Sequence, residues 1–168
     1  GQAYYAKHPE RVSGVVGIGT TPFGVSKYYK ASDLFWIHHY TKVAWWFPYS
    51  YYCSAAAKAV AVTERAQESM HQTLVELGRQ GMLQAAKAVY DEFLRRQDPV
   101  DFHCPVLLTY GEHDATGLVP SYNQAWATEC GHPLEIILAA AHNANDDNPE
   151  AFDRVLQAFL TEHGLMDS

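Results

Sequence analysis

The chain has 168 residues, of which 48% are hydrophobic and 18% are charged. That length suits one domain, and the large apolar share excludes a disordered chain. The net charge of -7 leaves no basic surface that could compensate phosphates, so we expect no nucleic-acid partner.

The amino-terminal segment predicts a helix that leads into a strand. Residues 1–8 have helical character, which Pro9 interrupts. Residues 12–19 form an apolar run typical of a buried strand, and a loop of turn-forming residues follows up to Gly24. The chain thus begins inside an element, without an initiator methionine or a helix cap. We therefore expect a further segment before residue 1.

The next segment, residues 25–98, predicts an all-helical insertion. It carries many strong helix formers and no strand pattern. Apolar positions three and four apart favour helices over 55–76 and 81–96. Gly78 and Gly81 mark the break that we expect between these two helices.

From residue 99 onwards, the pattern alternates between strand and helix. We expect strands over 106–110 and 134–139, and helices over 120–130 and 149–163. Strands that alternate with helices are typical of a parallel sheet with helices on its faces. The sequence therefore predicts the α/β class, with a partial parallel sheet and an all-helical insertion.

Two titratable side chains follow the strands of this last third. Asp114 comes just after the first apolar run, and His142 comes 28 positions later, just after the second run. Because the carboxyl ends of parallel strands meet at one edge of a sheet, both side chains are expected at one site. An acid and a histidine placed in this way are typical of two members of a nucleophile–histidine–acid triad. From the residues alone, Asp114 could also be a turn residue and His142 a packed or capping residue.

The neighbouring polar residues suit catalysis less well. Glu112 and His113 flank the acid and are expected to be solvated loop residues. His38 and His39 are adjacent, and on a helix their side chains point about 100° apart, so they do not form a chelating pair. We expect no metal and no cofactor.

The three cysteines are an odd number at wide spacings and include no CxxC pair. We expect them to be small buried side chains in a reducing compartment, which favours a cytoplasmic location. Residues 1–30 show no secretory signal, and no segment has the roughly 18 consecutive apolar residues that a membrane span requires.

Residues 28–52 hold half of all the Phe, Trp and Tyr residues in the chain. These aromatic side chains could form the packed core of the insertion, line an apolar substrate pocket, or face a lipid boundary. The acidic charge balance argues against the lipid boundary. The residues expected in a substrate pocket are Phe23, Phe35, Trp36, Trp45 and Trp46.

In order and spacing, these motifs resemble the carboxyl-terminal half of an α/β-hydrolase. The resemblance rests on the segments 8–12, 105–114, 134–142 and 148–150, which read HPERV, PVLLTYGEHD, LEIILAAAH and NPE.

The resemblance implies a division of the chain and a role for its two site residues. Residues 1–24 and 99–168 would form part of the hydrolase core, and residues 25–98 would form a helical cap. Asp114 would orient His142, and His142 would act as the general base. The nucleophile elbow, a G-x-S-x-G turn, would lie just before residue 1, because no serine in view occupies such a turn.

We therefore expect hydrolysis of an ester, amide or related bond in a small apolar substrate, with the nucleophile supplied from outside this sequence. One alternative keeps the fold but has an aspartate nucleophile, as in a dehalogenase or an epoxide hydrolase. Another alternative is a truncated, non-catalytic chain that binds a ligand or a partner. In each case, the missing amino-terminal half or another chain would complete the sheet.

Overall fold

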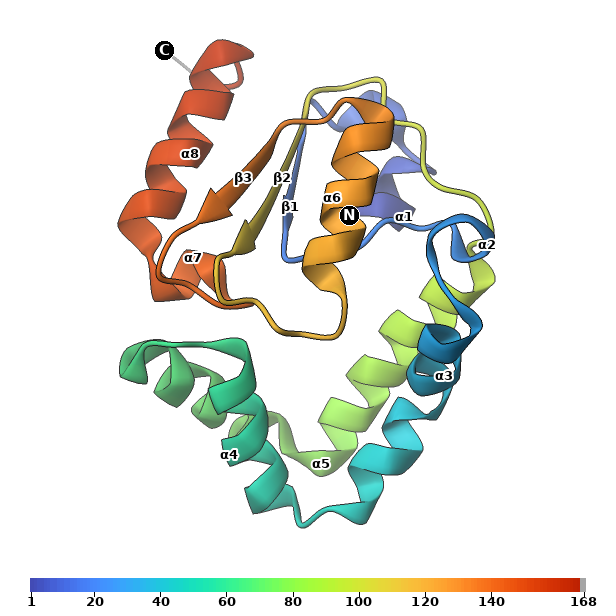
Figure 1. Cartoon of the computed structure of the whole chain (residues 1–168), viewed down its shortest axis with the longest axis vertical. Helices are drawn as coiled ribbons and strands as arrows, with labels where there is room; N and C mark the ends of the chain where they lie inside the picture. Colours follow the sequence, from blue (N-terminus) through green and yellow to red (C-terminus); the bar gives the residue numbers. More distant parts are fainter. Residues whose placement is uncertain (167–168) are drawn as a thin grey trace.

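A computed structural model gives the fold and describes residues 1–166. Three parallel strands form one sheet in the order β1-β2-β3. They are β1 (Val15–Ile18), β2 (Val106–Gly111) and β3 (Leu134–Ile137). The predicted class, α/β with a partial parallel sheet and a helical insertion, is confirmed (Figure 1).

Short and medium helices connect and cover these strands. They are α1 (Gln2–Tyr5), the 3-10 helix η1 (Pro9–Arg11), α6 (Val119–Cys130), α7 (Ala144–Asp147) and α8 (Pro149–Glu162). The start of α8 is fixed by Asn148, whose side chain accepts a hydrogen bond of 3.2 Å from the amide of Ala151. Helix α6 is terminated by Gly131, the residue after Cys130, which has φ of 69° and takes the left-handed conformation that glycine allows.

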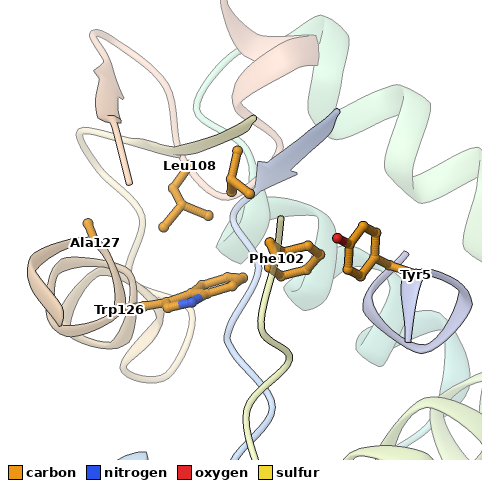
Figure 2. Close-up of a cluster of buried hydrophobic side chains, with 6 residues drawn as sticks. Tyr5, Phe102, Leu108, Trp126 and Ala127 are labelled. Atoms are coloured by element: carbon orange, nitrogen blue, oxygen red, sulfur yellow. The ribbon is translucent and has the colours of Figure 1, made fainter. Parts of the chain in front are cut away.

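The sheet separates two apolar cores because alternate residues of a strand point to opposite faces. On the α6 face, Leu108 of β2 packs with Trp126, and Phe102 lies between Trp126 and Tyr5 (Figure 2). On the other face, Ile137 of β3 belongs to a second cluster under α7 and α8. Every residue of β2 is buried, as expected for the central strand.

The third strand differs from its prediction. We expect a buried strand over 134–139, but β3 ends at Ile137 and pairs only with β2 in the described chain. At this edge, Ile136 is 48% exposed and Leu138 is 62% exposed. The run turns away from the sheet at Ala139, whose φ is 53°, so the three alanines form a loop.

Four helices span the segment between β1 and β2. They are α2 (Val25–Tyr28), α3 (Ala31–Trp46), α4 (Tyr49–Val60) and α5 (Glu64–Arg95). Of these, α3, α4 and most of α5 lie beyond the carboxyl ends of the strands (Figure 1). The segment returns to its starting point, because the amides of Gly24 and Val25 both donate to the carbonyl of Arg96, at 3.2 and 3.1 Å.

The prediction of one continuous helix over 55–76 was wrong, because two helices cover this range. Helix α4 ends at Val60, and α5 begins after Thr63, whose hydroxyl caps it by accepting from the amide of Ala66. Between them the backbone at Ala61 is extended. A distant carboxylate accepts hydrogen bonds from the amides of this break, and a tertiary contact thus replaces the helical ladder. The break expected near Gly78 is a kink within α5, where Gly78 has φ of 69° and ψ of 163°.

Candidate active site

The loop after β2 fixes Asp114 on both sides of its carboxylate. The amide of Asp114 donates to the carbonyl of Gly111 at 2.9 Å, which closes a turn at the strand end. Its Oδ1 accepts from the amide of Thr116 at 2.9 Å. The side chain is fully shielded from solvent. One oxygen is therefore held by the backbone, and the other is free to meet a second side chain.

The loop after β3 is bonded to the acid loop along its length. The amides of Glu112 and His113 donate to the carbonyls of Ile137 and Ala140, at 2.9 and 2.8 Å. The Glu112 carboxylate in turn accepts from the amide of Ala139 at 3.0 Å. Glu112 is exposed as expected, but it also supports the loop in which His142 lies.

Asp114 and His142 come together as the strand order predicts. Nδ1 of His142 lies 3.0 Å from Oδ2 of Asp114. An ionised carboxylate only accepts hydrogen bonds, so Nδ1 carries the proton and Nε2 has a free lone pair. Nε2 has no hydrogen-bond partner among residues 1–166, and the side chain of His142 is 27% exposed. An imidazole held in this tautomer can accept a proton through Nε2.

The electrostatics favour an ionised acid. Burial alone would raise the pKa of Asp114, but the hydrogen bonds from His142 and Thr116 outweigh burial, and the pKa lies below its ordinary value. A charged carboxylate next to Nδ1 also stabilises the imidazolium that forms when Nε2 takes a proton.

Two glycines bring the loops into contact, and the sequence analysis missed both roles. A Cβ at Gly111 would lie 2.1 Å from the carbonyl oxygen of Ala141, so any side chain there would push the histidine loop away. Gly19, at the end of β1, has φ of 52° and lies against the ring of His142, since a Cβ there would be 3.0 Å from Nδ1. The available signal was a glycine at the carboxyl end of β1 and of β2.

An apolar cavity of about 360 Å³ adjoins the loop that carries Asp114. Its walls come from α3, α5, α6 and the loops after β1 and β2, and none of the lining residues is charged. They are Thr21, Tyr29, Trp36, Ile37, Tyr40, Val89, Tyr90, Phe93, Thr116, Gly117, Leu118, Val119 and Tyr122. The polar ends of two tyrosines are already satisfied, because the hydroxyl of Tyr29 donates to the carbonyl of Pro22 at 2.7 Å and that of Tyr122 donates to Asp33. The cavity therefore suits an uncharged, apolar group.

The five aromatic residues expected in a substrate pocket are spread over several places. Trp36 lines the cavity. Phe23 packs near Phe93, with ring centres 6.4 Å apart, and Phe35 is 55% exposed and is not among the lining residues.

Trp45 and Trp46 instead border a second hollow, on the outside of the helical segment and together with Lys42 and Lys87. Trp46 is 85% exposed there. Of the five, Trp36 is therefore the one that borders the cavity near Asp114.

Within residues 1–166, no three His, Cys, Asp or Glu side chains gather in a way that could hold a metal ion. None of the helices in this part of the chain combines the length and apolar character needed to cross a bilayer.

No protein-family model matches the chain, and no curated protein matches it. Solved structures do match. A thermophilic esterase is 17% identical with a TM-score of 0.71, over 97% of this chain and 62% of the esterase. A malate-bound thermophilic esterase from Thermogutta terrifontis is 17% identical with a TM-score of 0.61, over 96% of this chain and 60% of the other.

A third structure, E-2-(acetamidomethylene)succinate hydrolase, is 16% identical with a TM-score of 0.57. The match covers 95% of this chain and 62% of that hydrolase. The chain therefore has the fold of the carboxyl-terminal part of an α/β-hydrolase with its helical cap, as the sequence motifs suggested. It spans about 60% of the length of the structures it matches.

Proposed function

We propose that this chain supplies the acid and the general base of a hydrolase that cleaves an ester, amide or related bond. The observation that carries the proposal is the 3.0 Å contact between Nδ1 of His142 and Oδ2 of the buried Asp114. The hydrolases among the similar structures support the same reaction class.

In this reaction, His142 takes a proton through Nε2 from a nucleophile and later gives it to the leaving group. Asp114 keeps the imidazole in the productive tautomer and stabilises its charged form. A segment outside residues 1–166 supplies the nucleophile. Because β1 pairs with β2 alone in the described chain, we infer that this segment, from the same protein or another chain, contributes a strand beside β1.

The substrate is a small and largely apolar molecule whose uncharged group enters the cavity that adjoins the loop after Asp114. With no charged residue in its lining, the cavity offers no partner for an ionised group, and burying such a group there would be costly. Residues 25–98 act as a cap, and the residues of α3 and α5 that line the cavity support this role.

The test uses the intact protein and a series of neutral aryl esters. We expect His142→Ala to lower kcat by about 10³-fold or more while the protein stays folded, because the general base is lost. His103→Ala is the matched control, since that ring is 80% exposed and lies near the amino-terminal end of β2. Near-normal turnover by a folded His142→Ala protein would contradict the proposal.

The type of nucleophile is read by mass spectrometry of the same intact protein. A neutral aryl phosphonate should leave a phosphonyl group on a serine nucleophile, whereas a haloalkane should leave an alkyl ester on an aspartate nucleophile. We expect the phosphonyl adduct, since esterases are among the most similar structures.

A further inference from the structure

We propose that Asp147 is a positioning residue that links the break between α4 and α5 to the loop of His142, so that the imidazole and this part of the cap move as one body. Its value for catalysis rests on the function proposed above, but the link itself can be tested without any substrate.

On the cap side, the carboxylate of Asp147 accepts hydrogen bonds from amides that would otherwise pair within a helix. Its Oδ1 accepts from the amide of Val62 at 3.0 Å, from the amide of Thr63 at 2.9 Å and from the hydroxyl of Thr63 at 2.9 Å. Its Oδ2 lies 3.1 Å from the amide nitrogen of Val62. The two amides are backbone donors that the break between the two helices leaves without helical partners.

On the core side, the same carboxylate holds the residue before the histidine. Oδ2 of Asp147 accepts from the amide of Ala141 at 2.9 Å, and this bond is buried. On the other side of His142, the amide of Asn143 donates to the carbonyl of Val60 at 2.8 Å. The backbone of His142 is therefore tied to the α4–α5 break through both of its neighbours.

Because Asp147 is buried, its charge depends on the hydrogen bonds that it accepts. The residue is only 8% exposed, and in residues 1–166 it forms no ion pair, so its charge depends on N–H and O–H donors alone. Burial acts to raise its pKa, but the bonds from Ala141, Thr63 and Val62 outweigh that effect and the pKa is lowered. Because a buried carboxylate that loses donors is costly, displacing the break without the loop is unfavourable.

A second contact at the same junction provides a control. Arg65, at the start of α5, pairs with Asp146 at 2.8 Å between Nη1 and Oδ1, and it also donates to the carbonyl of that residue. This ion pair joins the same two segments, but it is partly exposed and does not contact Ala141. Asp146→Asn therefore weakens the junction without touching the link to the histidine loop.

The experiment compares Asp147→Asn and Asp146→Asn by NMR in the intact protein. In Asp147→Asn, an NH₂ group replaces one acceptor oxygen. This NH₂ group faces backbone amides that are themselves donors, so hydrogen bonds are lost. We expect the amides of Val62, Thr63 and Ala141 to exchange at least ~10-fold faster. We also expect the Nδ1–H resonance of His142 to shift or broaden. In Asp146→Asn these signals should stay at their wild-type values.

The resonance of His142 separates positioning from simple stabilisation. A folded Asp147→Asn protein with an unmoved Nδ1–H signal would overturn the proposal, as would faster exchange at Val62 with unchanged exchange at Ala141. Should Asp147→Asn not fold, Thr63→Ala removes one donor to Asp147 together with the side-chain cap of α5, and it keeps the carboxylate. It must then shift the His142 signal in the same direction by a smaller amount, and an unmoved signal would again refute the link. Loss of hydrolysis plays no part in this result, so failure of the proposed function would be seen separately.

Discussion

Replacement of Asp114 by Asn is the sharpest test of the site, because the structure fixes how the amide would sit. Oδ1 is held by the amide of Thr116, which only an oxygen can satisfy. The NH₂ group of the asparagine must then take the place of Oδ2 and face Nδ1 of His142, 3.0 Å away. Two donors cannot share a hydrogen bond, so the imidazole is driven to carry its proton on Nε2.

This change removes the base without removing the ring. With a proton on Nε2, His142 can no longer accept one from a nucleophile, and the charge that stabilised the imidazolium is also gone. We expect kcat to fall by roughly 10³–10⁴-fold, as for an acid that sets the tautomer. That loss equals about 4–5.5 kcal/mol in activation free energy. It exceeds the ~1.5–3 kcal/mol that a single bond to a charged group contributes to folding.

Initial rates with a neutral aryl ester measure the loss, and ¹⁵N spectra of the imidazole report which nitrogen is protonated. His113→Ala is the matched control, because it lies next to Asp114, its side chain is exposed, and alanine keeps the backbone amide that bonds Ala140. A folded Asp114→Asn protein with kcat within a few-fold of wild type would refute the reasoning.

Three further outcomes follow from particular contacts. The folded pKa of Asp114 lies below its unfolded value of about 3.9, so the stabilisation that its carboxylate provides is complete above that pH and is lost as the pH falls through the lower folded pKa. Thermal unfolding measured from pH 7 to pH 2 tests this. A pH dependence of Asp114→Asn identical to that of the wild type would contradict it. Gly111→Ala should destabilise by at least ~3 kcal/mol in urea unfolding, because its Cβ would meet a backbone carbonyl, whereas Gly81→Ala meets only the flexible end of Leu77 and should change little. Leu118→Trp should fill the cavity and raise KM for bulky neutral esters more than for acetyl esters, while Trp46→Ala, on the outer hollow, should leave both KM values unchanged.

The sequence predicted the parts of the fold that depend on local pattern. The buried run of β2 and the helix opened by Asn148-Pro149 both follow from apolar periodicity and capping. The pairing of Asp114 with His142 followed from strand order, since each residue comes just after a parallel strand.

The errors concern contacts that arise only in three dimensions. The helix over 55–76 is broken because Asp147, more than 80 positions away, accepts hydrogen bonds from Val62 and Thr63. Nothing in the local sequence around Val62 indicates that partner. Likewise, Trp36 and Trp46 occur on one aromatic helix, and composition could not separate the one that faces the cavity from the one that faces solvent.

The close approach of Gly24 and Arg96 bears on how the fold could diversify. The helical segment between β1 and β2 begins and ends at one place, because the amides of Gly24 and Val25 both donate hydrogen bonds to the carbonyl of Arg96. The two strands are therefore connected as they would be by a short loop. Segments of different length and composition could be exchanged at this junction while the register of β1 with β2 stays intact. The helical segment can therefore change without disturbing the strand pairing, provided that a new segment still donates hydrogen bonds to Asp147.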